Sequence, residues 1–74
     1  MNSTVKNSEA TSFESLFLNQ LLTYKQAAKY LSVSESYLRR LKSHGVVPHV
    51  YVGNRGVRFR VSSLNRWIEK REVT

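Results

Sequence analysis

The sequence predicts a small α+β domain in which two short helices joined by a tight turn precede a two-stranded hairpin and a last helix. Apolar residues recur with a helical period of about 3.6 twice between residues 23 and 44, and again after residue 62. Between these stretches the period changes to two, as in strands. The chain has 74 residues, which is the size of one domain.

The N-terminal stretch begins with residues 1–10, which are polar or charged and favour a flexible segment. Thr11 and Glu14 then have the spacing of a capping box, in which each side chain accepts a backbone N–H of the first helical turn. We therefore expect residues 1–20 to be flexible, with a short helix at about 12–19.

This short helix has an apolar stripe at helical spacing, formed by Phe13, Leu16, Phe17 and Leu21. Two interpretations are open. The stripe packs on the domain and enlarges a small core, which we favour, or it contacts a neighbouring copy or another protein.

The folded domain is expected over residues 21–71, and its first helix follows Thr23. Thr23 and Gln26 make a second capping box. The apolar face of this helix comprises Tyr24, Ala27, Ala28 and Leu31. The two alanines suit a close crossing with a neighbouring helix. Ser32 and Val33 form the turn, and Val33 is expected to fill the space between the two helices.

The second helix is expected over about residues 35–44. Ser34 is a favourable N-cap, Gly45 suits the left-handed residue that ends a helix, and Pro48 prevents the helix from resuming. The residues expected to point inward are Tyr37, Leu38 and Leu41. The opposite arc holds Glu35, Ser36, Arg39 and Ser43, flanked by Arg40 and Lys42.

After Pro48, residues 49–52 and 57–61 alternate as two strands, with a Gly-Asn-Arg-Gly turn at 53–56. We expect the inner face of this hairpin to be apolar. Its outer face and tip carry the basic residues Arg55, Arg58 and Arg60. A lone hairpin is marginally stable in water, so this one should lie on the helices.

The last helix is predicted to begin at Ser62 as its cap. Its apolar stripe is Leu64, Trp67 and Ile68. Trp67, the only tryptophan, is expected to anchor the core rather than to stack on a nucleobase. The end of the chain, from Arg71, is expected to fray.

The formal net charge is +7, and it belongs to the domain. Residues 1–22 hold one base and two acids, whereas residues 23–74 hold 11 bases and three acids, a net charge of +8. Such a field favours a polyanionic partner, most often nucleic acid.

Several chemistries lack support in the sequence. The chain has no cysteine or aspartate, the glutamates are scattered, and two histidines have no third metal ligand nearby. We therefore expect no enzymatic activity, no cofactor or metal and no small-molecule substrate. No apolar run is long enough for a membrane span and no signal peptide is evident, so we expect a soluble, cytoplasmic protein without membrane contacts.

A family resemblance extends over residues 21–70. The positions that carry it are Leu21-Leu22-Thr23, Gln26-Ala27-Ala28, Tyr30-Leu31, Val33-Ser34, Leu41, Gly45, Pro48, Val52-Gly53, Arg58-Phe59, Leu64 and Trp67. Together they resemble the excisionase-type helix-turn-helix family, which comprises small MerR-like winged-helix DNA-binding proteins of phages and mobile elements. The fold that the resemblance implies is a small winged helix-turn-helix.

The resemblance also implies a function. The second helix enters the major groove of double-stranded DNA, and the hairpin is a wing on the backbone or the minor groove. Family members are recombination directionality factors (excisionases) that assist a tyrosine integrase and bind DNA beside further copies of themselves, or small transcriptional regulators. A different class, a protein-interaction module using the N-terminal apolar segment, stays open.

Candidate contacts with DNA follow from these expectations. Facing the groove floor are Ser36, Arg39 and Ser43, and Arg39 is the best candidate for a base edge because arginine binds guanine bidentately. Arg40 and Lys42 are placed on flanking phosphates. The wing candidates are Arg55 for the minor groove and Arg58 and Arg60 for phosphates. The candidates for further backbone contacts are Thr23, Tyr24, Lys25 and Tyr37.

Overall fold

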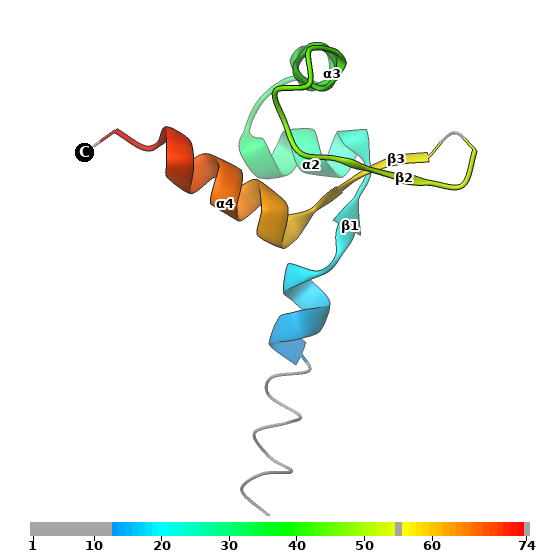
Figure 1. Ribbon diagram of the computed structural model, residues 1–74, viewed down its shortest axis with the longest axis vertical. Coiled ribbons are helices and arrows are strands. Elements are labelled where there is room, and N and C mark those ends of the chain that lie inside the picture. The colour runs from blue at the N-terminus through cyan, green and yellow to red at the C-terminus, as the bar shows by residue number, and fades with distance from the viewer. Residues whose placement is uncertain (1–12, 55, 74) are drawn as a thin grey trace, which may run out of the picture.

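The computed structural model describes residues 13–54 and 56–73 (Figure 1). The elements are β1 (Leu21–Leu22), α2 (Tyr24–Leu31), α3 (Glu35–Ser43), β2 (Val50–Val52), β3 (Gly56–Arg60) and α4 (Val61–Arg71). Residues 13–18 form a further helix ahead of β1. The order and the antiparallel sheet confirm the expected α+β winged helix-turn-helix. Within the described ranges, no helix combines the length and apolar composition that crossing a bilayer takes.

The sheet has three strands in the order β1-β3-β2, so the expected hairpin gains a third strand. Leu21 pairs with Arg60 and Leu22 with Phe59, both antiparallel. The backbone N–H of Val61 then donates to the carbonyl of Gln20 at 3.0 Å, just beyond the ladder. β1 therefore fixes the base of the hairpin, which would be marginally stable alone.

The core lies where α2, α3 and α4 meet the sheet. Its buried residues are Leu22, Ala27, Ala28, Leu38, Val47, Phe59, Val61 and Leu64. Ala27 and Ala28 are almost completely covered, as expected for small side chains at a close helix crossing. Val33, in the turn between α2 and α3, packs against this cluster, as its position in the sequence predicts.

The capping predictions for the two helices of the helix-turn-helix are confirmed. Gln26 N–H donates to Thr23 Oγ1 at 3.2 Å and Thr23 N–H donates to Gln26 Oε1 at 3.0 Å, which completes the capping box. Ser34 Oγ accepts from Tyr37 N–H at 3.1 Å. At the end of α3, Gly45 has a φ of 67°, and its N–H donates to the Lys42 carbonyl at 3.0 Å. Glycine adopts this left-handed conformation at little cost.

The last helix differs from the prediction at both ends. α4 begins at Val61 directly after β3, Arg60 is its N-cap residue, and no side chain caps it, so Ser62 is not the cap. The bond from Val61 N–H to Gln20 satisfies one amide that a cap would otherwise serve. At the other end, Arg71 is helical and its Cζ lies 4.4 Å from the centroid of the Trp67 ring, so fraying does not begin there.

Trp67 packs against the core from its rim and is not fully buried. Its Nε1–H donates to the Val46 carbonyl at 2.7 Å. This bond ties α4 to the segment that leaves α3, so Trp67 is an anchor between elements, as its apolar stripe predicts.

The helix of residues 13–18 does not enlarge the core. Phe13 is 74% exposed, Leu16 70% and Phe17 54%. Figure 1 shows this helix projecting beyond β1, away from the helices of the domain. The favoured interpretation that its stripe packs on the domain is therefore wrong. Thr11 of the proposed capping box lies outside the described residues.

We predict that Gly56→Ala destabilises the hairpin, because a Cβ at Gly56 would stand 2.5 Å from the backbone oxygen of Val52. Crowding of this kind costs about 1–3 kcal/mol, and urea denaturation would measure the loss in the free energy of unfolding. Gly53→Ala is the matched control, since a Cβ there meets nothing within 4 Å and only the φ of 71° is unfavourable. A smaller loss for Gly56→Ala than for Gly53→Ala would contradict the prediction.

Candidate nucleic-acid interface

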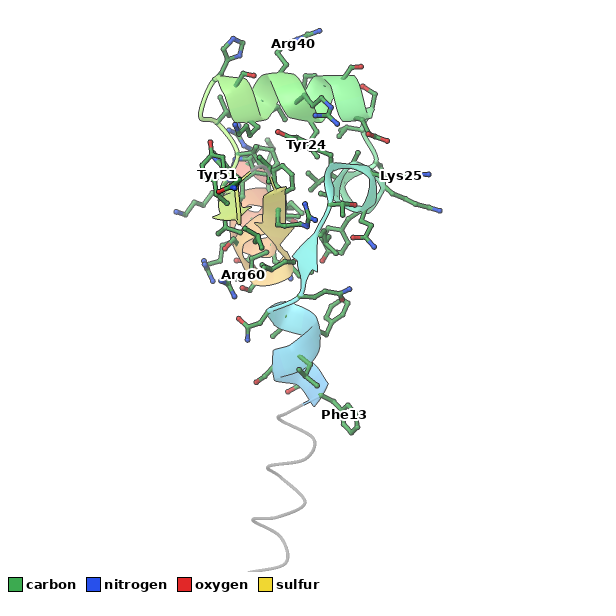
Figure 2. All side chains as sticks on the ribbon, turned by 90° about the vertical axis from the view of Figure 1, so that its right-hand side faces the viewer. Phe13, Tyr24, Lys25, Arg40, Tyr51 and Arg60 are labelled. Atoms are coloured by element: carbon green, nitrogen blue, oxygen red, sulfur yellow. The ribbon has the colours of Figure 1, made fainter. Side chains whose placement is uncertain are left out.

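One face of the molecule is bounded by α3 and the β2–β3 hairpin. Figure 2 shows α3 above the side chains of Tyr24 and Tyr51, with Arg40 on the opposite side of the helix, pointing away from the domain. Tyr24 is the first residue of α2 and Tyr51 is the middle residue of β2. Two residues of α3 extend cationic groups to these two rings.

The first of these cations is Arg39. Its guanidinium carbon lies 4.0 Å from the centroid of the Tyr24 ring. The Tyr24 ring meets the buried Phe59 ring edge to face, with centroids 5.2 Å apart and an interplanar angle of 67°. A continuous contact therefore runs from the core to the exposed guanidinium. Stacking uses the face of the guanidinium and leaves its in-plane N–H donors for other partners.

The second cation is Lys42. Its Nζ lies 5.0 Å from the centroid of the Tyr51 ring. Hydrogen bonding to Tyr51 raises the pKa of Lys42 above its ordinary value. Tyr51 is itself held edge-on by His49, with ring centroids 5.5 Å apart. α3 and the hairpin are thus joined by an aromatic–cation contact.

The strand register explains why Tyr51 is in this position. Tyr51 pairs with Val57 and Val52 with Gly56, so the hairpin loop has three residues. A four-residue turn at 53–56, as the sequence predicts, would instead pair Val52 with Val57. A register shift of one residue exchanges the two faces of a strand.

The inner face of the hairpin therefore differs from the expected apolar one. Directly paired residues share a face, so Tyr51 lies on the face of Val57, while Val50 shares the outer face with Arg58. Tyr51 was missed as a site residue for this reason. The alternation of residues 49–52 shows that Tyr51 and the two valines lie on opposite faces of the strand. Which of these faces is the inner one follows only once the loop length is known.

The other candidate residues of α3 lie on its exposed side. Ser36, Arg40 and Ser43 are exposed, as is Arg39. The Ser43 hydroxyl donates to the Arg39 carbonyl at 2.9 Å, so its proton is already used within the helix and its lone pairs remain available. The exposed arc of α3 predicted from the sequence is therefore present.

Tyr37 departs from the expectation that it points inward. It is 45% exposed and lies at a groove beside Trp67 and Ile68 of α4. Tyr37 and Arg39 are two residues apart, which is about 200° around a helix, so they lie on different sides of α3. Tyr37 is not brought together with Tyr24.

The arginines of the hairpin separate from one another. Arg58 is half-buried, and its Nη1 donates to the Val57 carbonyl at 2.9 Å. Arg60 pairs with Leu21 at the β1 end of β3, and its Nη1 donates to Asn19 Oδ1 at 3.1 Å. Figure 2 shows Arg60 well away from α3. Arg55 lies outside the described residues.

The N-terminus of α2 adjoins the face at Tyr24. The capping box occupies the Thr23 hydroxyl and the Thr23 and Gln26 amides, which leaves the amides of Tyr24 and Lys25 unused by the box. Lys25 is exposed and points outward from α2 in Figure 2. Free amides, the helix dipole and a nearby ammonium together suit an anion such as phosphate.

Comparison with known proteins gives one match. A family model described as a helix-turn-helix domain matches residues 21–72, which cover every element from β1 to α4. No curated protein and no solved structure matches the chain.

We predict that the Tyr24 ring positions Arg39 in free protein. Protons of the Arg39 side chain should show an upfield ring-current shift in NMR spectra, because the guanidinium lies over the ring. Tyr24→Leu should abolish the shift and Tyr24→Phe should keep it. The Arg40 resonances are the internal control, and an Arg39 spectrum unaffected by Tyr24→Leu would contradict the contact.

Proposed function

Because the chain belongs to the family of helix-turn-helix domains, we propose that it binds double-stranded DNA sequence-selectively, with α3 in the major groove and the β2–β3 hairpin as a wing. Family membership supports DNA binding itself. The observation that carries the more specific proposal is the pair of cations held on aromatic rings, Arg39 on Tyr24 and Lys42 on Tyr51, on the face between α3 and the hairpin.

The dimensions and chemistry of α3 fit the major groove. Its nine residues extend about 14 Å, and the groove of B-DNA is about 12 Å wide. Arg39 is the proposed base-contacting residue, because its in-plane N–H groups match guanine O6 and N7. Its contact with Tyr24 reduces the side-chain freedom that binding would otherwise remove. Ser36 and Ser43 are the proposed neighbours of Arg39 at the groove floor.

Phosphate contacts are proposed on both sides of this centre. Arg40 and Lys42 flank the exposed arc of α3, and the amides of Tyr24 and Lys25 offer a further site at the start of α2, next to Thr23. Arg58, and Arg55 at the turn, are the proposed wing contacts. Arg60 lies at the end of β3 that pairs with β1, and it is bonded to Asn19. Both observations favour a structural role for Arg60 instead.

For the biological role, we propose an excisionase that assists a tyrosine integrase, with a small transcriptional regulator as the alternative. The resemblance of residues 21–70 to excisionase-type proteins supports the first role. Excision assays on supercoiled element ends, with and without the cognate integrase, would separate the two. Stimulated excision supports the excisionase, whereas altered transcription from a bound promoter without stimulated excision supports the regulator.

We predict that Arg39→Ala weakens binding to the cognate site by about 1–3 kcal/mol and relaxes base preference at one position. Selection from a randomised duplex pool, followed by titration of the selected site, measures both effects. Arg40→Ala is the matched control on the same helix and should weaken all duplexes alike. Equal losses on random and cognate DNA for Arg39→Ala would remove it as a base-contacting residue.

We also predict a steep dependence of affinity on salt. Neutralising about five phosphates gives a slope of about −4 to −5 in a plot of log affinity against log salt concentration. Lys42→Gln should reduce the magnitude of the slope by about 1, because one phosphate contact is lost. A wild-type slope near −1 would be incompatible with contacts from both α3 and the wing.

A further inference from the structure

Two apolar surfaces of the described chain are left uncovered. One is the stripe of Phe13, Leu16 and Phe17 on the helix of residues 13–18. The other is a groove of about 370 Å³ between the helix-turn-helix and α4. The side chains that give the groove its apolar lining include Tyr30, Val33, Tyr37, Leu41, Trp67 and Ile68.

The walls of this groove are fixed by hydrogen bonds. Tyr30 on α2 donates its hydroxyl proton to Asn65 Oδ1 on α4 at 2.6 Å. Trp67 is held by its 2.7 Å bond to the Val46 carbonyl, and the Arg71 guanidinium lies over its ring. An apolar groove whose walls are already positioned is suited to receive the side chains of an amphipathic helix.

The helix of residues 13–18 cannot reach the groove of its own domain without breaking contacts. Only Asn19 and Gln20 separate it from β1, and both are bonded to the β3–α4 junction. Asn19 accepts from Arg60, and Gln20 accepts from Val61. The groove lies along the second half of α4, from Trp67 onward. Trp67 is about 9 Å from Val61 along the helix axis, so the groove is distant from the residues that hold Asn19 and Gln20. Figure 1 shows the N-terminal helix running away from that half.

We propose that the helix of residues 13–18 of one copy docks in the α2–α3–α4 groove of a second copy. Phe13, Leu16 and Phe17 have the i, i+3, i+4 spacing by which amphipathic helices enter grooves. Charge is complementary as well, because the N-terminal segment of residues 1–22 has a net charge of −1 and the rest of the chain one of +8. Of the two charged residues that line the groove, Arg71 is opposite in charge to Glu14 on the helix and Glu72 has the same charge as Glu14.

This contact joins different surfaces of the two copies and so is heterologous. The groove opens on the Tyr37 side of α3, about 200° around the helix from Arg39. Docking therefore leaves the proposed DNA face free, and the proposal does not depend on DNA binding. Three apolar side chains bury less area than a stable interface of about 1,200 Å² or more, so the contact is weak in free solution and a trapping experiment suits it.

The trap uses the absence of cysteine from the chain. Equal amounts of Leu16→Cys and Ile68→Cys proteins are mixed without DNA under mild oxidation. The possible dimers have the same mass, because leucine and isoleucine are isomers, so mass spectrometry of disulfide-linked peptides after non-reducing proteolysis identifies which cysteines are joined. We expect the Leu16–Ile68 heterodimer to exceed the half share of all dimers that random pairing gives. Val73→Cys in place of Ile68→Cys is the control, because Val73 is 92% exposed and does not line the groove.

Two outcomes of this experiment overturn the proposal. A predominance of Leu16–Leu16 homodimers means that the N-terminal helices pair symmetrically with each other. A heterodimer yield no higher with Ile68→Cys than with Val73→Cys means that the helix does not enter the groove.

Charge substitutions provide a second test in sedimentation experiments. Leu16→Glu and Ile68→Glu should each weaken self-association at least about tenfold, because each removes an apolar contact from the interface. Mixing Leu16→Glu with Ile68→Glu should restore one contact per pair of copies, because the unchanged helix of the Ile68→Glu protein can enter the unchanged groove of the Leu16→Glu protein. Both sites are exposed, so folding should persist, and circular dichroism checks it. Unchanged association in either glutamate variant overturns the proposal.

Discussion

The contact between Tyr24 and Phe59 links the core of this domain to its proposed DNA-binding face. Phe59 belongs to the central strand of the sheet and is completely buried. Its ring supports Tyr24, and Tyr24 supports the guanidinium of Arg39. The same strand holds β1 on one side and β2 on the other, and it continues directly into α4. The position of the hairpin, the start of the last helix and the orientation of Arg39 therefore all depend on how this one strand is packed.

Sequence patterns predicted the helix-turn-helix well, because the interactions that define it are local. Thr23, Ser34 and Gly45 act within three or four residues of their own positions, so a cap or a stop is visible in the sequence itself. The prediction failed where a distant segment intervened. Ser62 resembles a cap, but Gln20 already serves the Val61 amide from across the sheet. β1 has two residues, which is too short to show any period.

The candidate site shows the same division between local and distant effects. Helical spacing placed Arg39 and Ser36 on the exposed arc of α3, but no local pattern indicates which rings lie beneath Arg39 and Lys42. The ring of Tyr51 is placed by the strand register, which a loop of three rather than four residues sets, and the ring of Tyr24 is placed by its packing on Phe59. The stripe of Phe13, Leu16 and Phe17 is a different case. An amphipathic pattern is the same whether the helix packs on its own domain or on another molecule, so only the structure separates the two interpretations.

The short lengths of β1 and β2 affect how copies of this protein can meet. They are the edge strands of the sheet, with two and three residues, and Pro48 precedes β2 closely. An exposed edge usually invites another strand to add to the sheet, which leads to fibres or aggregates. Edges this short offer too few backbone groups for such an addition. Copies of this protein that lie close together on a nucleic acid therefore do not pair their strands into open-ended sheets. Contacts between copies have to be made by side chains.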